Sequence, residues 1–224
     1  MTSTRQQFVN AFPGVKHTVI YTDLDGKHFR FSGGTWAWRN HNPGNLRPGK
    51  ISRRHNQIGE TYGFAIFPNV ESGHNALLDL LSNVYANYSI DRMIVKFAPP
   101  KENPTKKYAK LIHEKTGIYD DRPIKKFTAE QFEKLWKAIQ QMEGYKTGKI
   151  VEVFRVTGVQ PIDKHTYKFC LNEGDWISES QCISLAGQGK VELEVCVSDL
   201  GNKFLRSPAN SIFQTRLEDL KQTP

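Results

Sequence analysis

The stretch from Trp36 to Arg47 (WAWRNHNPGNLR) constrains the fold most, because it gathers aromatic, amide and basic side chains where we expect no regular helix or strand. A residue before proline is pushed out of the helical region, and Gly44 can adopt a positive φ, so Pro43-Gly44 predicts a sharp turn. This turn would hold Asn42 and Asn45 on its two sides. Their amides could then converge on one surface.

Such a loop suits the recognition of sugars. Its amides can donate and accept hydrogen bonds, while Trp36, Trp38 and Arg47 add apolar faces and a charge. Neutral rings that carry hydroxyl and N-acetyl groups need both kinds of contact. The alternative is an Asn-rich loop whose amides only satisfy its own backbone, since Asn-Pro-Gly also marks ordinary turns. The segment by itself leaves both interpretations open.

Length, composition and charge limit the classes of protein that fit. The 224 residues, 38% of them hydrophobic, suffice for one full domain and a smaller one. A run of about 18 apolar residues and an apolar signal region are both missing, so we expect neither a membrane span nor signal-directed export. Residues 1–148 carry 22 Lys and Arg against 13 Asp and Glu, a formal charge of +9, and residues 149–224 carry −1. The first part should therefore attract a polyanion such as nucleic acid, a membrane surface or an anionic cell wall.

Cysteine and histidine usage argues against metal chemistry. The three cysteines (Cys170, Cys182 and Cys196) are odd in number and have apolar neighbours. They predict buried free thiols and folding in a reducing compartment. The seven histidines lack the spacing of metal ligands, and no Cys-x-x-Cys accompanies them. We expect no metal and no other cofactor.

The periodicity changes near Gly148, which predicts a boundary between domains 1–148 and 149–224. The second part is strand-like, with one helix at the Ser178–Gln181 capping box and a polar tail after about Ser207. The first part begins with a hairpin whose turn is Asp25-Gly26. Apolar spacing and capping signals then predict four helices: Ser72–Tyr88, Ile90–Phe97, one from Asn103-Pro104 to Gly117, and one from Thr128 to Glu143.

Glu143 is the first candidate for chemistry. At about 100° per residue it falls on the apolar face of the last helix, near Phe132, and Gly144 can end the helix directly after it. Burial and the negative helix end both disfavour the charged form, so the pKa of Glu143 should be raised, as a general acid requires. The alternative is a frayed helix end with a solvated carboxylate.

Two other carboxylates could complete a pair. Glu102 precedes a helix N-terminus, which favours its charged form and a role as base or binder of hydroxyl groups. It could equally be a surface residue that caps the helix. Glu60, beside Tyr62 in a loop, is the third candidate. Paired carboxylates remain because the chain shows no phosphate loop, no Gly-x-Ser-x-Gly and no cysteine in its basic part.

Several separated motifs occur in a characteristic order: RNHNPGNLR (39–47), GFAIF (63–67), ESG (71–73) with Ala76, FAPPKENPT (97–105) with Tyr108, and Ile139 with Glu143-Gly144. Read together, they resemble a family of bacteriophage structural lytic proteins and related secreted bacterial cell-wall hydrolases. The resemblance covers roughly residues 36 to 148 and implies a lysozyme-like, mostly helical domain that cleaves the glycan strands of peptidoglycan. In lysozyme-like glucosaminidases the Glu at a helix end precedes the Asn-rich loop, whereas here it comes last, which a circular permutation would explain. The tryptophan usual before Gln57-Ile58-Gly59 is missing, with His55 or Asn56 near its place.

Together these observations predict an α+β protein: a mostly helical lysozyme-like domain, then a small β-rich accessory domain with one helix. The expected activity is that of a muramidase, with Glu143 as the acid and Glu102 or Glu60 as the second carboxylate. A lytic transglycosylase and a non-enzymatic polyanion-binding protein are the alternatives. The expected substrate-binding residues are Trp38, Asn42, Asn45, Arg47, Tyr62 and Tyr108.

Residues 150–206 look like a small bacterial module of uncharacterised function, with no chemistry of its own. Its fusion to a hydrolase is similar to antibacterial effectors of type VI and other contractile injection systems, and to phage lytic proteins. This resemblance implies peptidoglycan, a cognate immunity or inhibitor protein, and a secretion apparatus or virion component as partners. It also implies synthesis in the cytoplasm without a signal peptide, non-classical delivery, and action in the periplasm or wall of a target bacterium.

Overall fold

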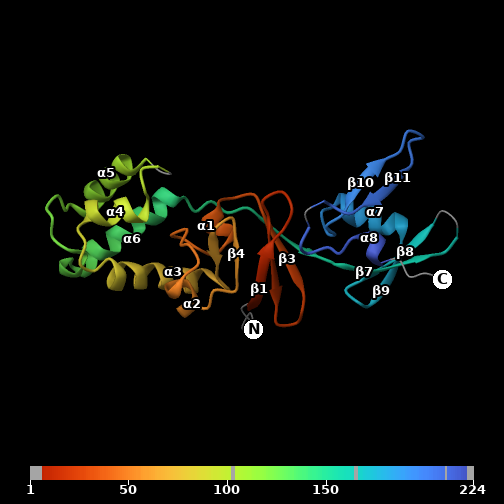
Figure 1. The fold of residues 1–224 in the computed structure, drawn as a ribbon, viewed down its shortest axis with the longest axis horizontal. Helices are drawn as coiled ribbons and strands as arrows, with labels where there is room; N and C mark the ends of the chain where they lie inside the picture. Colours follow the sequence, from red (N-terminus) through yellow and green to blue (C-terminus); the bar gives the residue numbers. More distant parts are fainter. Residues whose placement is uncertain (1–6, 102–103, 164–165, 210, 221–224) are drawn as a thin grey trace, which may run out of the picture. The chain divides into compact units, whose positions relative to one another are not determined.

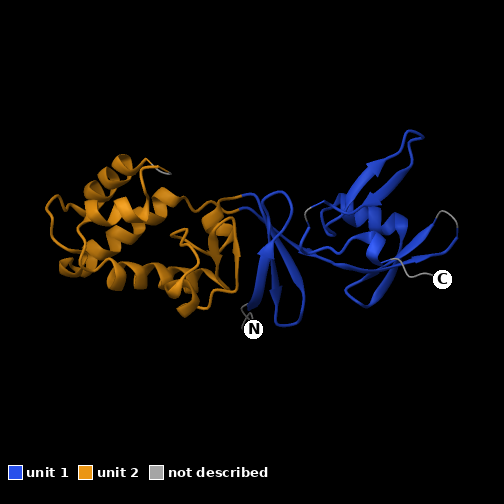
Figure 2. Cartoon of the chain, viewed as in Figure 1, with its two compact units in different colours: residues 1–33, 148–224 blue, residues 34–147 orange. Residues whose placement is uncertain are grey.

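The computed structural model describes residues 7–101, 104–163, 166–209 and 211–220. The chain forms two compact units: residues 34–147, and a terminal unit that joins residues 1–33 to residues 148–224 (Figure 2). The expected boundary near residue 148 is thus one of two places where the chain passes between units. Residues 1–33, which we had expected in the first domain, belong with the C-terminal part.

A four-stranded antiparallel sheet joins the two ends of the chain in the terminal unit. The predicted hairpin is present, since β2 pairs with β3 and the Gly26 amide donates to the Asp23 carbonyl in the turn. Strand β3 also pairs with β6 over five positions, from His28 opposite Val153 to Ser32 opposite Lys149. The order is β1 (Phe8–Pro13), β2 (Val19–Asp23), β3 (His28–Ser32) and β6 (Lys149–Val153).

Buried polar contacts tie these strands to the C-terminal segment of the same unit. Glu192 is buried, and its carboxylate accepts hydrogen bonds from the Val15 amide at 2.9 Å and from the Ser211 hydroxyl. The Arg30 guanidinium donates to the Gly189 carbonyl at 2.7 Å. A polar group buried without such partners is costly, so these contacts fix which segments belong together.

The rest of the terminal unit, in the residues that the structure describes, is a three-stranded sheet, a two-stranded hairpin and two helices (Figure 1). Helix α7 begins at the predicted Ser178–Gln181 capping box. The expected polar tail after Ser207 is wrong, because Phe213 and Leu217 are buried there. All three cysteines are free thiols, with Cys170 and Cys182 buried and Cys196 half-buried. The elements are β7 (Val156–Pro161), β8 (Tyr167–Leu171), β9 (Asp175–Ser178), α7 (Glu179–Gly187), β10 (Glu194–Val197), β11 (Lys203–Arg206) and α8 (Leu217–Leu220).

The 34–147 unit packs helices around one core and carries a short hairpin (Figure 1). Leu77, Leu81, Ile112 and Leu135 are fully buried in this core. The elements are α1 (Trp36–Arg39), α2 (Lys50–Arg54), β4 (Gly59–Thr61), β5 (Phe64–Ile66), α3 (Val70–Asp79), η1 (Leu80–Val84), α4 (Ile90–Phe97), α5 (Thr105–Thr116), η2 (Ile124–Lys126) and α6 (Ala129–Glu143).

Local signals placed some of these helices correctly and failed for others. Helix α4 has the predicted bounds, and Gly117 ends α5 with a φ of 70°. Helix α1 forms where we expected no regular element, because the Arg39 amide closes a helical turn on the Thr35 carbonyl. The predicted helix start at Asn103 lies outside the described residues, and Pro104 precedes the first helical residue instead of occupying it.

The helix expected over Ser72–Tyr88 is interrupted. Helix α3 ends at Asp79, and Leu80–Val84 forms one π-helical turn, in which the Tyr85 amide donates to the Leu80 carbonyl at 3.0 Å. Such turns insert an extra residue into a helix and often occur at functional sites. Here the turn shifts the side chains that follow it relative to a continuous helix.

The expected fold class is wrong. The structure is 36% helical and 25% strand, with four small sheets in the described residues, so a mostly helical lysozyme-like domain does not describe it. Strands β1 to β5 all fall within residues 1–148, where helices were expected to dominate. Each of them is only three to six residues long, and such short strands explain why periodicity underestimated the strand content. None of the helices in the described ranges has both the length and the apolar composition that crossing a bilayer requires.

Candidate active site

Helix α6 carries Glu143 to the edge of a cleft. The helix starts at the predicted capping box, in which the Gln131 amide donates to Thr128 Oγ1 at 3.2 Å and the Thr128 amide to Gln131 Oε1 at 3.0 Å. Its inner face buries Leu135 and Ile139. Glu143 is the last helical residue, and Gly144 turns the chain away with a φ of 70°. The helical periodicity of the sequence predicts both the end of α6 at Glu143 and the position of Glu143 on its inner face.

Two hydrogen bonds hold the Glu143 carboxyl. The Asn45 Nδ2 group donates to Oε2 at 2.8 Å, and the Tyr108 hydroxyl donates to Oε1 at 2.9 Å. Burial raises the pKa of Glu143, and these two hydrogen bonds only partly oppose it, so the pKa lies above the usual 4.5. Burial, together with the neighbouring carboxylate, also raises the pKa of Tyr108. Tyr108 therefore stays a hydrogen-bond donor.

The cleft has a volume of about 620 Å³ and lies within the 34–147 unit. It is lined around helix α2 by segments 44–47 and 49–52, and by Leu80, Val84 and Tyr85 at the π-helical turn. Phe64, segment 96–99 at the end of α4, and Glu143 complete the lining. Among the described residues that line it, Glu143 is the one carboxylate, whereas Arg47, Lys50 and Lys96 are cations.

The side chains of the two asparagines in the turn form different hydrogen bonds, so their amides do not converge as expected. Asn42 Nδ2 donates to the carbonyls of Leu46 and Ala65, both at 2.9 Å, and its Oδ1 accepts from the Leu46 amide at 2.8 Å. Its side chain thus holds the loop together, as the backbone-satisfying interpretation proposed. Asn45 is the amide that reaches Glu143.

The backbone of the turn also differs from expectation. The Asn45 amide closes it on the Asn42 carbonyl at 2.9 Å, but the positive φ values belong to His41 (50°) and Asn45 (45°), not to Gly44. Glycine is needed at position 44 for space, because a Cβ there would lie 2.5 Å from the Leu46 side chain. His41 is buried, which lowers its pKa to about 4 and leaves its ring neutral at pH 7.

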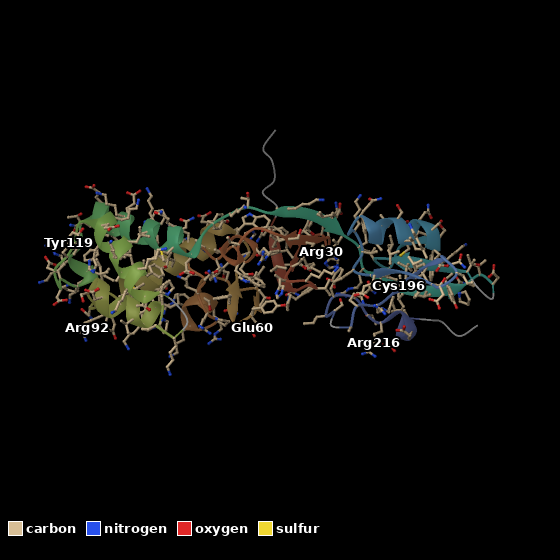
Figure 3. The ribbon with its side chains drawn as sticks, turned by 90° about the horizontal axis from the view of Figure 1, so that it is seen from above. Arg30, Glu60, Arg92, Tyr119, Cys196 and Arg216 are labelled. Atoms are coloured by element: carbon tan, nitrogen blue, oxygen red, sulfur yellow. The ribbon has the colours of Figure 1, made fainter. Side chains whose placement is uncertain are left out.

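The remaining sequence candidates lie elsewhere. Glu60 is exposed on β4, opposite Ala65, and is not among the residues that line the cleft (Figure 3). Glu102 lies outside the described residues. Trp38 is buried, whereas Tyr62 is 59% exposed and packs its ring on Trp36 at a centroid distance of 4.9 Å.

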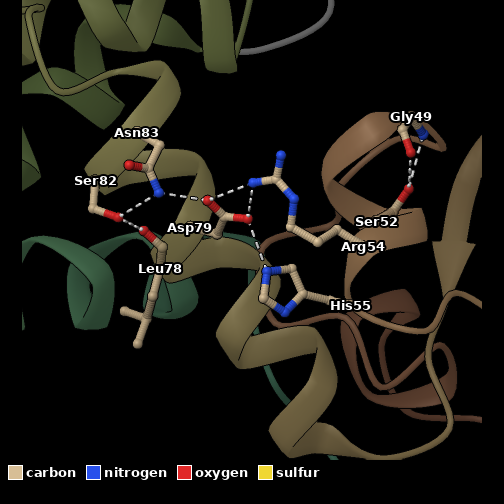
Figure 4. Close-up of polar contacts among 8 residues, drawn as sticks. All are labelled: Gly49, Ser52, Arg54, His55, Leu78, Asp79, Ser82 and Asn83. Carbon is tan, nitrogen blue, oxygen red and sulfur yellow. Dashed lines mark hydrogen bonds and ion pairs between the residues drawn. The ribbon is translucent and has the colours of Figure 1, made fainter.

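A polar cluster that the sequence did not indicate connects α2, which lines the cleft, to α3. The Asp79 carboxylate on α3 accepts hydrogen bonds from Arg54 at 3.0 Å, His55 at 2.9 Å and Asn83 at 2.6 Å (Figure 4). Burial acts to raise the pKa of Asp79, but the hydrogen bonds outweigh it and the pKa is lowered. Because Arg54 and His55 lie at the end of α2, the cluster fastens α2 to α3.

The described residues contain no group of three or more His, Cys, Asp or Glu side chains arranged to hold a metal ion. Searches of protein-family models, curated proteins and solved structures returned no match to this chain.

Proposed function

We propose that this protein is a peptidoglycan muramidase in which Glu143 is the general acid. The observation that carries the proposal is a half-buried carboxyl with a raised pKa that lines a cleft and is oriented by Asn45 and Tyr108. A carboxyl whose pKa is raised holds its proton more tightly and can give it to a glycosidic oxygen as the bond breaks. The resemblance of the motifs to phage lytic proteins supports the same assignment.

The cleft and the charge around it suit a glycan from a cell wall. A volume of about 620 Å³ lies within the range of small-molecule sites and can hold a short stretch of sugar. Tyr85 and Phe97 supply apolar faces, and Arg47, Lys50 and Lys96 supply charge. Residues 34–147 carry 18 Lys and Arg against 11 Asp and Glu, a formal charge of +7, which favours an anionic wall.

A hydrolytic mechanism normally needs a second carboxylate, which acts as nucleophile or activates water. Glu60 is badly placed for this role, because it lies on β4 and does not line the cleft. Glu102 follows Pro99, a lining residue, by three positions in the sequence. We therefore favour Glu102 as the second carboxylate.

A lytic transglycosylase is the second candidate, and one observation favours it. Glu143 is the single carboxylate among the described residues that line the cleft. One carboxyl would suffice if it first protonated the leaving oxygen and then, as a carboxylate, removed the proton from a hydroxyl of the same muramic acid. That hydroxyl would form the new bond at the sugar carbon, and an anhydro sugar would result.

Digestion of purified peptidoglycan, followed by mass analysis of the soluble products, separates these functions. We expect fragments that end in reducing muramic acid. Anhydro-muramic ends would identify a transglycosylase, and free peptides alone would contradict both proposals. An intact wall together with salt-sensitive DNA binding would favour the non-enzymatic polyanion-binding protein.

The resemblance also supports a proposal for the biological setting. We propose that the protein acts on the wall of a target bacterium after delivery by a contractile injection system or as part of a virion. The terminal unit would serve binding or delivery, and a cognate immunity or inhibitor protein would protect the producing cell.

A further inference from the structure

Three cations line the same cleft as Glu143. Arg47 lies just before helix α2, Lys50 is the first residue of α2, and Lys96 lies in the last turn of α4. All three are exposed. The cations therefore come from two separate segments that border one cleft. Recognition of a neutral polysaccharide would not require this charge.

These cations are not among the main causes of the raised pKa of Glu143. Burial is the main influence on the pKa of Glu143, followed by the hydrogen bonds from Asn45 and Tyr108, and no lysine or arginine is among its causes. A cation within about 4–6 Å would favour the charged carboxylate. The positive charges of Lys50 and Lys96 are thus available to a substrate group that lies away from the bond being broken.

The two lysines line the cleft and have no carboxylate partner in the described residues. Helix α2 fixes the backbone of Lys50. The Gly49 amide donates a hydrogen bond to Ser52 Oγ at 2.8 Å and so caps this helix, and Asp79 connects the end of the helix to α3. The Lys96 ammonium lies 5.8 Å from the centre of the Tyr88 ring. Within the described part of the chain, neither lysine forms an ion pair.

We infer that the cleft recognises carboxylate groups carried by the muramic acid residues of the glycan, with Lys50 and Lys96 as specificity-determining residues. This inference rests on the proposed function. The carboxylates could come from the acidic peptide stems or, where a stem has been removed, from the lactyl group that carried it. In both cases acidic wall glycan is preferred over neutral N-acetylglucosamine oligomers.

Steady-state kinetics on three substrates test this inference: soluble peptide-bearing glycan chains, the same chains after amidase treatment, and neutral N-acetylglucosamine oligomers. The double variant Lys50→Met/Lys96→Met should raise KM for peptide-bearing chains about 3- to 10-fold, as expected for the loss of two exposed ion pairs, and leave kcat within about 2-fold. Its KM for neutral oligomers should change much less than its KM for peptide-bearing chains. The matched control is Lys125→Met/Lys126→Met, which removes the same charge from exposed positions in η2 that do not line the cleft.

The three substrates also identify the source of the carboxylate. A preference that persists after amidase treatment assigns it to the lactyl group, and a preference that disappears assigns it to the peptide stem. Equal KM values for acidic and neutral substrates, or equal behaviour of the double variant and its control, would overturn the inference and leave the muramidase proposal standing.

Binding separates failure of this inference from failure of the proposed function. If no glycan is cleaved, the muramidase proposal fails, and co-sedimentation of the Glu143→Gln protein with purified peptidoglycan and with chitin then tests recognition alone. Selective binding to peptidoglycan that Lys50→Met/Lys96→Met weakens would support the inference. Equal binding to both polymers would contradict it.

Discussion

Replacement of Glu143 by Gln is expected to slow glycan cleavage at least 100-fold while the fold stays intact. Gln matches the size of Glu and can still accept the hydrogen bond from Asn45, but it has no acidic proton to give. General acid catalysis typically contributes about 10² to 10⁴-fold. The loss should appear as a lower rate of new reducing ends released from purified peptidoglycan.

The same substitution should have a pH-dependent effect on stability. Because the folded-state pKa of Glu143 is raised, the folded protein holds this proton more tightly than the unfolded chain does. The contribution of Glu143 to the free energy of unfolding is therefore fully present below about pH 4.5. It is lost as the pH rises through the folded-state pKa of Glu143. The Gln variant does not undergo this loss. The difference in Tm between the variant and the wild type should therefore be more favourable to the variant near pH 7 than near pH 4. A large fall in Tm near pH 7 would show that the carboxylate stabilises the fold.

Two further variants test the assignment of Glu143 as the acid. Glu60→Gln is the matched control, because Glu60 is exposed and lies outside the cleft lining, and it should leave the rate unchanged. Glu102→Gln should be inactive if Glu102 is the second carboxylate. An active Glu143→Gln beside an inactive Glu102→Gln would move the acid to Glu102. Full activity in all three would rule out carboxylate catalysis.

The substitution Gly73→Ala is expected to destabilise the 34–147 unit by about 3 kcal/mol, the upper part of the range for overpacked sites. A Cβ at position 73 would meet the carbonyl oxygen of His41 well inside the 3.0 Å limit of real Cβ contacts, and also the Phe67 ring. The His41 carbonyl belongs to the backbone and cannot rotate away as the end of a side chain would. Helix α3 would have to move off the loop that positions Asn45, so activity should fall as well.

Thermal unfolding measures this effect, and about 3 kcal/mol corresponds to a decrease in Tm of roughly 10 °C. Gly187→Ala in α7 is the matched control, because nothing lies within 4 Å of an added Cβ there and its φ is not positive. Ala should be neutral or slightly stabilising at that position. An unchanged Tm for Gly73→Ala would mean that α3 does not pack directly on the loop.

Elements of the fold that are set by neighbouring residues could be predicted from the sequence. Helix α6 runs from its capping box to Gly144, and the β2–β3 hairpin turns at the expected residues. The pairing of β3 with β6 could not be predicted, because their partner residues are more than 100 positions apart and local periodicity carries no information on partners. The π-helical turn and the burial of Phe213 likewise depend on packing against distant segments.

In the candidate site, too, the local features could be predicted from the sequence, whereas the contacts between distant segments could not. The helical wheel placed Glu143 on the inner face, but its contact with Asn45 depends on positive φ values at His41 and Asn45 that no pattern specified. Asn42 looked equivalent to Asn45 in sequence, yet it serves only the loop. Lys50 and Lys96 had no signal at all, since single lysines on exposed helix positions are common.

The carboxyl of Glu143 is the group on which the proposed chemistry depends, and NMR can follow its titration directly. Protein labelled with ¹³C at the Glu carboxyl carbons would be titrated from about pH 3 to pH 8, with Glu143→Gln identifying the signal. Burial in the cleft predicts a midpoint clearly above the usual 4.5. A midpoint at or below 4.5 would show an ordinary ionised carboxylate at neutral pH and would contradict its role as the acid.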